Sequence, residues 1–159
     1  MKITHASIWL VSSAFLIALP SLSQPLPPPT NEEMKALIPK GVIFKPDLDY
    51  RKGNEAWKLD LYVPEAKSDV PRPAIVFIHG GGFRHGDKRY RFTGDGIWFL
   101  EFLGNYAKAG YVVISVNYRL SKEAPFPAAI QDVKTAIRWL KANAKDLNVD
   151  PLRVGVFGH

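Results

Sequence analysis

Cysteine is absent from the 159 residues of the chain, which excludes disulfides, thiol catalysis, zinc–thiolate sites and a lipid-modified N-terminal cysteine. Neither sign of charge dominates strongly: 21 lysines and arginines against 15 aspartates and glutamates give a net charge of +6. No basic stripe with interleaved aromatic residues and no recognisable nucleic-acid-binding module accompany this charge, so we expect no nucleic-acid partner. We interpret the densest basic stretch as serving solubility and weak anion attraction: Arg84, Lys88, Arg89 and Arg91.

A hydrophobic run long enough to span a membrane is also lacking. The apolar stretch near the N-terminus, Ile8 to Leu19, is preceded by Lys2 and followed by the small residues of Ser21 to Ser23. This run is shorter than the about 20 apolar residues that a bilayer span needs. A basic residue, a short apolar run and small residues in this order are typical of a secretory signal peptide. We predict a signal peptide over residues 1–23, cleaved before Gln24, and a secreted or periplasmic protein without a stable membrane anchor.

With 47% hydrophobic and 23% charged residues the chain has a globular composition, and no internal repeat is found. Prolines crowd the stretch after the predicted cleavage site (QPLPPPT, Gln24 to Thr30), which favours an extended spacer outside the fold. We therefore predict a proline-rich linker and N-terminal extension over residues 24–40, followed by a folded region over residues 41–159.

Short apolar and β-branched runs alternate with helix-like segments over the folded region. Val42 to Phe44 and Leu59 to Val63 flank turn residues at Lys52 to Asn54, which predicts an antiparallel hairpin. Later runs predict three buried strands and two helices: strands at 74–78, 111–116 and 153–157, helices around 98–109 and from Pro127 through Leu140. Strands that alternate with helices indicate a parallel sheet with right-handed crossovers, so we predict an α/β fold.

Chemistry is concentrated at His79 to Phe83 (HGGGF), directly after the first of these buried strands. Three glycines without Cβ atoms let the backbone turn sharply with its N–H groups directed inward, which suits the binding of an anionic oxygen. A flexible glycine turn is the alternative interpretation. His85 stands where a dinucleotide-binding fingerprint needs glycine, and the Gly-Lys-Ser/Thr of a phosphate-binding P-loop is missing, so both of those functions are excluded.

Five motifs follow one another along the chain: HGGGF at 79–83, GDK at 86–88, NYRL at 117–120, PFPAAIQD at 125–132 and DPLRVGVFGH at 150–159. Together they resemble the α/β-hydrolase esterases of the hormone-sensitive-lipase and feruloyl-esterase-like (BD-FAE-like) group, over nearly all of the chain after the predicted signal peptide. The resemblance implies the N-terminal portion of an α/β-hydrolase fold over residues 41–159. This portion has a short antiparallel start, then parallel strands with crossover helices, and is truncated at the nucleophile elbow.

The resemblance also implies roles for residues around the glycine motif. The backbone N–H groups of Gly81 and Gly82 would form the oxyanion hole, together with one N–H after the nucleophile. Neighbouring residues are expected to shape the loop, without binding a metal, or to line the substrate pocket: loop-shaping His79, Gly80, His85 and Asp87; pocket candidates Phe83, Arg84 and Trp98. Tyr118 and Arg119 are expected to support the active-site loops through core or salt-bridge contacts, and Asp132 to stabilise a helix start.

Gly158 and His159 match the first two residues of the GxSxG nucleophile elbow of that family. The nucleophile, the acid and the catalytic histidine would follow, so no residue of this chain is assigned to those roles, and we expect the chain alone to be inactive. The resemblance implies a carboxylic ester hydrolase that works through an acyl-enzyme, without a cofactor, on a small-molecule or polysaccharide-linked ester. A secreted serine peptidase of the same fold and a non-catalytic α/β-hydrolase-like binding protein stay as alternatives, and the oligomeric state is left open.

The predicted signal peptide is open to a direct test. Expressed from its own start codon in a Gram-negative host, the full-length protein should be found outside the cytoplasm, with Gln24 or a near neighbour as its N-terminal residue. Cell fractionation followed by N-terminal sequencing measures both properties. Cytoplasmic protein that retains Met1 would contradict the prediction.

Overall fold

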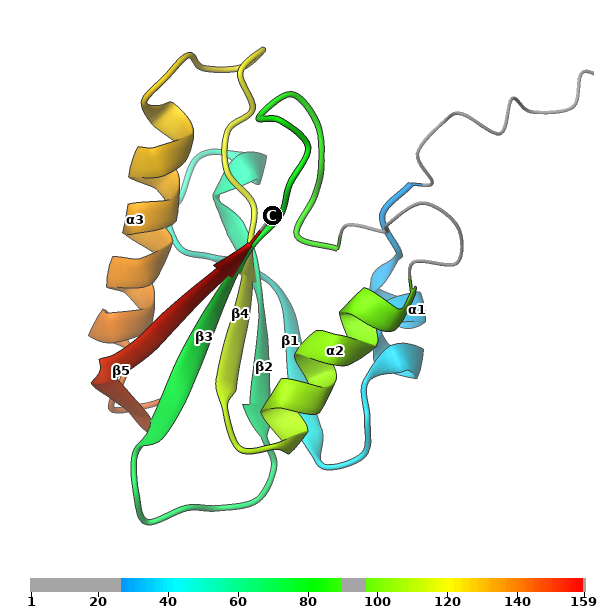
Figure 1. The fold of residues 1–159 in the computed structure, drawn as a ribbon, viewed down its shortest axis with the longest axis vertical. Helices are drawn as coiled ribbons and strands as arrows, with labels where there is room; N and C mark the ends of the chain where they lie inside the picture. The colour runs from blue at the N-terminus through cyan, green and yellow to red at the C-terminus, as the bar shows by residue number, and fades with distance from the viewer. Residues whose placement is uncertain (1–26, 90–96, 159) are drawn as a thin grey trace, which may run out of the picture.

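The computed structural model describes residues 27–89 and 97–158 and, for residues 97–100, the backbone only. The predicted signal peptide, Arg91 and His159 lie outside the described residues. The described residues form a five-stranded sheet with helices on both faces (Figure 1).

The sheet has the strand order β1-β2-β4-β3-β5. Its strands are β1 (Val42–Asp49), β2 (Lys58–Pro64), β3 (Arg72–Ile78), β4 (Val112–Val116) and β5 (Val149–Gly158). β2 pairs antiparallel with both β1 and β4, whereas β3 pairs parallel with both β4 and β5. The predicted hairpin and the predicted α/β fold class are therefore confirmed, and β3 lies between the two strands that follow it in the sequence.

Helices cover opposite faces of the sheet, so the strands between them are apolar on both sides. Helix α3 (Ala128–Ala142) covers one face, and helices α1 (Asn31–Leu37) and α2 (Ile97–Lys108) cover the other (Figure 1). On β2, Leu61 packs in the cluster that contains Leu140 of α3, whereas the next residue, Tyr62, packs with Met34 of α1 and Leu103 of α2. This alternation explains why the central strands read as continuous apolar runs.

The observed ends and buried faces of the two longer helices agree in part with those predicted from the sequence. Gly110, with a φ of 106°, follows α2, as expected for a residue that terminates a helix. Helix α3 buries residues spaced four apart, namely Ala128, Asp132, Ala136 and Leu140. Ile130 is one of the apolar residues that recur at helical spacing in this segment, but its side chain is exposed. The buried stripe of α3 therefore contains two alanines, an aspartate and a single large apolar side chain, Leu140.

Helix α1 lies within the segment predicted as linker and extension, and no apolar periodicity predicts it. The Thr30 hydroxyl accepts a hydrogen bond from the Glu33 N–H, and the Glu33 carboxylate accepts one from the Thr30 N–H. This capping box starts a helix of seven residues whose Met34 is fully buried. Pro39 then packs on Gly104 of α2, where a Cβ would lie 2.6 Å from the proline Cδ. Residues 29–40 are therefore part of the packed structure.

The contact between Gly104 and Pro39 leaves no space for a side chain, so Gly104→Ala should destabilise the full-length protein. In an unobstructed helix, exchange of glycine for alanine stabilises by about 1 kcal/mol. Here the added methyl group must displace Pro39 or bend α2, so we expect a lower midpoint of urea denaturation. Asn105→Ala, at an exposed position of the same helix, is the matched control and should not lower the midpoint. A raised midpoint for Gly104→Ala would show that this packing is wrong.

Candidate active site

The segment 79–89, here called the glycine loop, leaves the carboxyl end of β3 and runs beside the segment that follows β4 (Figure 1). Ligand sites of parallel α/β sheets lie beyond the carboxyl ends of the strands. The glycine loop contains every oxyanion and loop-shaping candidate named from the sequence. The structure thus brings these residues together at the end of the sheet where a ligand is expected.

A tight turn forms the tip of the glycine loop. Gly81 and Gly82 have φ angles of 112° and 59°, and Phe83 follows at 61°. The Gly81 carbonyl oxygen accepts hydrogen bonds from the N–H groups of Arg84 (3.0 Å) and His85 (3.3 Å), which closes the turn. Residues other than glycine seldom adopt such φ angles, so the backbone path explains the glycines at positions 81 and 82.

Close approach of the backbone requires glycine at two positions of this loop. A Cβ on Gly81 would lie 2.0 Å from the His85 carbonyl oxygen, and one on Gly86 would lie 2.5 Å from the Gly80 carbonyl oxygen. At Gly82 a Cβ would meet no atom within 4 Å. The backbone N–H groups of Gly81 and Gly82 donate to no acceptor among the residues that the structure describes. These two donors are therefore free to bind an anionic oxygen.

His79 and Tyr118 fix the upstream end of the loop. The Nδ1 atom of the buried His79 lies 2.8 Å from the Gly80 carbonyl oxygen, and its ring stacks on the Tyr118 ring at a centroid distance of 4.3 Å. The Tyr118 hydroxyl donates to the His79 carbonyl oxygen at 2.8 Å. Burial raises the pKa of Tyr118, so its phenol stays a neutral donor. His79 thus lies beneath the turn, in contact with its backbone.

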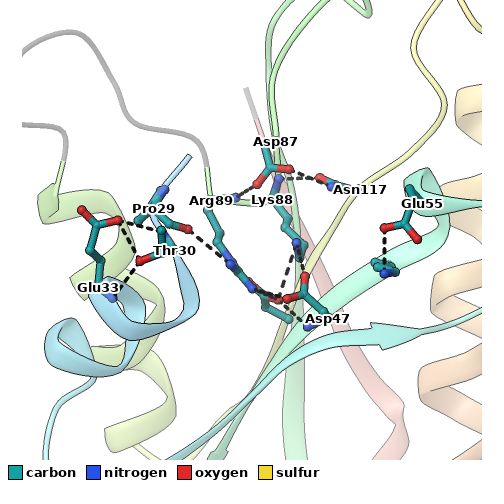
Figure 2. Close-up of polar contacts among 11 residues, drawn as sticks. Pro29, Thr30, Glu33, Asp47, Glu55, Asp87, Lys88, Arg89 and Asn117 are labelled. Carbon is teal, nitrogen blue, oxygen red and sulfur yellow. Dashed lines mark hydrogen bonds and ion pairs between the residues drawn. The ribbon is translucent and has the colours of Figure 1, made fainter. Parts of the chain in front are cut away.

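Asn117 and Ser115 hold the downstream end of the loop. The Asn117 Oδ1 accepts from the Lys88 N–H at 2.5 Å, and its Nδ2 donates to the Asp87 carboxylate at 2.8 Å. The same carboxylate accepts from the Arg89 N–H at 2.8 Å, and the Ser115 hydroxyl donates to the Lys88 carbonyl oxygen. Figure 2 shows Asp87 between the backbone of Arg89 and the amide of Asn117. Residues of β4 and its continuation therefore set the position of both loop ends.

Arg119 and Asp132 form an ion pair between the segment after β4 and helix α3. The Asp132 carboxylate accepts from the Arg119 Nε and Nη2, both at 2.8 Å, and from its backbone N–H at 3.1 Å. The expected salt-bridge role of Arg119 is what the structure shows. The expectation that Asp132 stabilises a helix start is wrong. This buried residue lies beyond the first turn of α3, and its carboxylate is paired with Arg119.

Four charged residues, here called the charge quartet, lie together: the buried Asp60, Lys88 and Arg89 and the partly exposed Asp47. The Arg89 Nε and Nη2 contact the two Asp60 oxygens at 2.5 and 3.0 Å, and Nη2 also lies 3.0 Å from Asp47. The Lys88 Nζ contacts Asp47 at 2.8 Å and Asp60 at 3.7 Å. Two negative and two positive charges leave the quartet neutral, as burial requires.

Two of the basic residues interpreted as serving solubility thus have another role. Lys88 and Arg89 are only 5% and 6% exposed, and both are engaged in ion pairs inside the protein. The interpretation is wrong for them because charge counting does not distinguish a solvated cation from a paired one. The Asp60 carboxylate, which is fully buried, was not predicted as a site residue. Its one sequence signal is an acid within an otherwise apolar strand, which must find a partner.

Asp47 keeps its charge through its two cationic neighbours. It lies at an irregularity in the pairing of β1 with β2, between Lys45 and Leu48, and has a φ of 56°. Burial alone would raise the pKa of Asp47, but the hydrogen bond and charge of Lys88, followed by the charge of Arg89, lower it to about 2. The irregularity directs this carboxylate toward the glycine loop instead of along the strand ladder.

The predicted pocket residues are only partly placed. Phe83 and Arg84 are exposed and line a hollow of about 420 Å³, whose other walls come from Gly82, from the segment after β4 and from the first turn of α3: Arg119, Ser121, Ala124, Phe126, Ala129 and Ile130. The Ser121 N–H donates to the Phe83 carbonyl oxygen at 2.7 Å, which ties the tip of the glycine loop to this wall. Trp98 belongs to α2, and its side chain lies outside the described residues.

The described residues offer no complete set of catalytic side chains. Ser115 is the buried serine among them, and its hydroxyl donates to the Lys88 carbonyl oxygen instead of to a histidine. Within residues 27–89 and 97–158, no group of three or more His, Cys, Asp or Glu residues could hold a metal ion. In the same residues, no helix is both long and apolar enough to cross a membrane.

Comparison with known proteins agrees with this geometry. The BD-FAE family model matches residues 59–159. Arylacetamide deacetylase from Bos taurus is 34% identical over 135 residues, which covers 82% of this chain and 29% of the relative. Carboxylesterase NlhH from Mycobacterium tuberculosis is 40% identical over 86 residues, which covers 54% of this chain and 25% of the relative.

Solved structures give the same result. Esterase B from Lactobacillus rhamnosis has a TM-score of 0.64 at 26% identity, covering 80% of this chain and 40% of that one. A truncated carbohydrate esterase from gut microbiota has a TM-score of 0.57 at 34% identity, covering 73% and 39%.

The strand order, the glycine loop after β3 and these similarities define an α/β-hydrolase fold. The chain belongs to the BD-FAE family. It spans less than half the length of each relative and structure named above. The resemblance found in the sequence motifs and the partial α/β-hydrolase fold are both confirmed.

The lowered pKa of Asp47 makes stability sensitive to acid. Because this pKa is about 2 in the folded protein and ordinarily 3.8, the ion pairs of Asp47 contribute fully at neutral pH and are lost as the pH falls from about 4 to 2. In Asp47→Asn the contribution is absent at every pH. The difference in urea midpoint between the wild-type full-length protein and this variant should therefore shrink over that interval. Glu32→Gln, which removes an exposed ion pair, is the control and should show no such trend. A difference that stays constant down to pH 2 would contradict the assignment.

Proposed function

We propose that the full-length protein is a carboxylic ester hydrolase of the serine type, to which this chain contributes the oxyanion hole. The observation that carries the proposal is the pair of backbone N–H groups of Gly81 and Gly82, held in a rigid turn without acceptors among the described residues. Relatives named esterase and carboxylesterase support an ester as the substrate. In this proposal His79, Gly80 and Asp87 shape the loop, and Phe83, Arg84 and Trp98 line the pocket.

Ester hydrolysis develops negative charge at one defined atom. A nucleophile adds to the carbonyl carbon, and the carbonyl oxygen becomes the oxyanion of a tetrahedral intermediate. Collapse of that intermediate expels the alcohol and leaves an acyl-enzyme, which water then cleaves to the acid. The N–H groups of Gly81 and Gly82 would donate to the oxyanion in both steps. Because the turn is closed by hydrogen bonds at Gly81, these donors need no rearrangement when the charge appears.

The pairing of β5 with β3 supports a nucleophile beside this loop. Gly158 lies opposite Ile78, and a Cβ on Gly158 would approach the Ile78 carbonyl oxygen to 2.7 Å. Since Ile78 directly precedes His79, the chain that leaves Gly158 starts next to the glycine loop. We propose that Gly158 and His159 open a GxSxG elbow whose serine attacks the ester, with the acid and the catalytic histidine supplied by later residues.

The proposed substrate is a small-molecule or polysaccharide-linked ester outside the cytoplasm. The hollow beside Phe83 adjoins Gly82, so a group bonded to the reacting carbonyl would enter it. Likeness to a carbohydrate esterase supports a polysaccharide-linked ester. The apolar run and small residues before Gln24 support export through a signal peptide over residues 1–23.

Turnover of an ester tests the proposal. The full-length protein should hydrolyse a short-chain nitrophenyl ester with saturation kinetics, and prior treatment with an activated phosphonate ester, which phosphonylates an active serine and releases its leaving alcohol, should abolish turnover. In Gly81→Ala the added methyl group must open the turn at His85, so kcat should fall by about 100- to 1000-fold. Absence of saturable turnover in the wild-type protein would refute the proposed function.

Gly53→Ala is the matched control for Gly81→Ala. Gly53 has a comparable φ of 100°, but it lies in the turn before β2, where the nearest atom to an added Cβ is 3.8 Å away. It therefore carries the same backbone cost without touching the glycine loop, and kcat should stay within about twofold of wild type. Equal losses of turnover in the two variants would show that Gly81 acts through general stability alone.

A further inference from the structure

We propose that the charge quartet is a positioning device for the oxyanion hole, and that the N-terminal segment around Pro29 and Thr30 belongs to this device. The inference rests on the proposed ester hydrolysis and adds to it a set of residues that act through the loop backbone. None of the four charged residues lines the hollow beside Phe83, so they are positioning residues, not catalytic ones.

The quartet helps to hold the downstream part of the glycine loop. Lys88 and Arg89 are the last described residues of the loop, and their side chains are bound by Asp47 of β1 and Asp60 of β2. The upstream end of the loop is fixed by Tyr118. The turn at its tip is closed by hydrogen bonds from the N–H groups of Arg84 and His85 to the Gly81 carbonyl oxygen, so we expect the tip to shift as a unit when either side of the loop shifts. Displacement of Arg89 should therefore be transmitted to the N–H groups of Gly81 and Gly82.

The guanidinium of Arg89 binds three separate segments at once. Its Nε and Nη2 bind the two oxygens of Asp60, Nη2 also binds Asp47 at 3.0 Å, and Nη1 donates to the Pro29 carbonyl oxygen at 3.2 Å. The planar guanidinium has several N–H donors and can bind these partners at the same time, whereas a lysine ammonium carries the same charge without this arrangement of donors. Arg89→Lys therefore keeps the positive charge and removes the hydrogen-bond geometry.

The Pro29 carbonyl brings the N-terminal segment into the device. Pro29 is buried and lies 60 residues before Arg89 in the sequence. Figure 2 shows the Arg89 side chain between Pro29 and Asp47, with the capping box of Thr30 and Glu33 on the side of Pro29 that faces away from Arg89. The capping box fixes the backbone of Thr30, and Met34 anchors α1 in the core. Loss of the cap should therefore displace the carbonyl that Arg89 binds.

Three variants of the full-length protein test the device, namely Arg89→Lys, Asp47→Asn and Thr30→Val. Each is compared with wild type for kcat and KM on a nitrophenyl ester, for the melting temperature, and for amide hydrogen exchange in the peptide that spans residues 79–86. We expect kcat to fall by about 10- to 100-fold in Arg89→Lys, because small displacements of a catalytic group have effects of this size. KM should change by less than about threefold, and exchange in the 79–86 peptide should accelerate.

Smaller losses of the same kind are expected for the other two variants. Thr30→Val removes a hydrogen bond far from the hollow, so a kcat effect without a KM effect would show that the N-terminal segment acts on the loop. Arg153→Lys is the matched control, because Arg153 forms an exposed ion pair with Asp150 within β5. It should leave kcat and exchange in the 79–86 peptide unchanged.

The outcomes separate this inference from the proposed function. If wild type turns over esters while the folded variants keep wild-type kcat and wild-type exchange, the positioning role is overturned and the proposed function stands. If wild type shows no turnover, the proposed function fails, and exchange in the 79–86 peptide still decides whether the quartet fixes the loop. Should Arg89→Lys fail to fold, Asp47→Asn and Thr30→Val decide the question in the same way, since both leave the Arg89–Asp60 pair in place.

Discussion

The side-chain amide of Asn117 determines where the glycine loop lies. The proposed oxyanion hole needs backbone N–H groups that have no partner inside the protein, so the loop cannot be held by those groups. It has to be held by others, and an amide that accepts from Lys88 and donates to Asp87 does this with a single side chain. The N–H groups of Gly81 and Gly82, which have no acceptor among the described residues, therefore depend on contacts made five to seven positions further along the chain.

Burial of charge beneath this loop restricts its conformations. Removing one partner of a buried ion pair typically costs about 3–5 kcal/mol, which is a large share of the roughly 5–15 kcal/mol that stabilise a folded protein. Asp60 is fully buried and has Arg89 and Lys88 as its cationic partners, so any loop conformation that withdraws both of them leaves a carboxylate without a cation in the core. Such conformations are disfavoured by the charge itself, independently of the packing around it.

Apolar runs and glycines made the central strands and the glycine loop predictable, because both signals are local. The runs at 74–78 and 111–116 correspond closely to β3 and β4, and the three glycines mark the turn after β3. Helix α1 has seven residues and one buried side chain, too few for a period to emerge. Pairings such as Arg89 with Asp60 or Arg119 with Asp132 join distant residues, so the sequence shows the charges but not their partners. The same limit explains why Lys88 and Arg89 were interpreted as solvated.

The strand order has a consequence for the time at which the sheet assembles. Because β4 lies between β2 and β3, the N-terminal hairpin cannot join β3 until residues 112–116 have been synthesised. Until then both edges of β3 and one edge of β2 are without neighbours, although these strands are completed well before β4 leaves the ribosome. Pairing between elements so far apart in sequence also slows folding, since the intervening chain must first be brought together. A nascent chain with this topology stays unfolded longer than one in which each strand pairs with the strand before it.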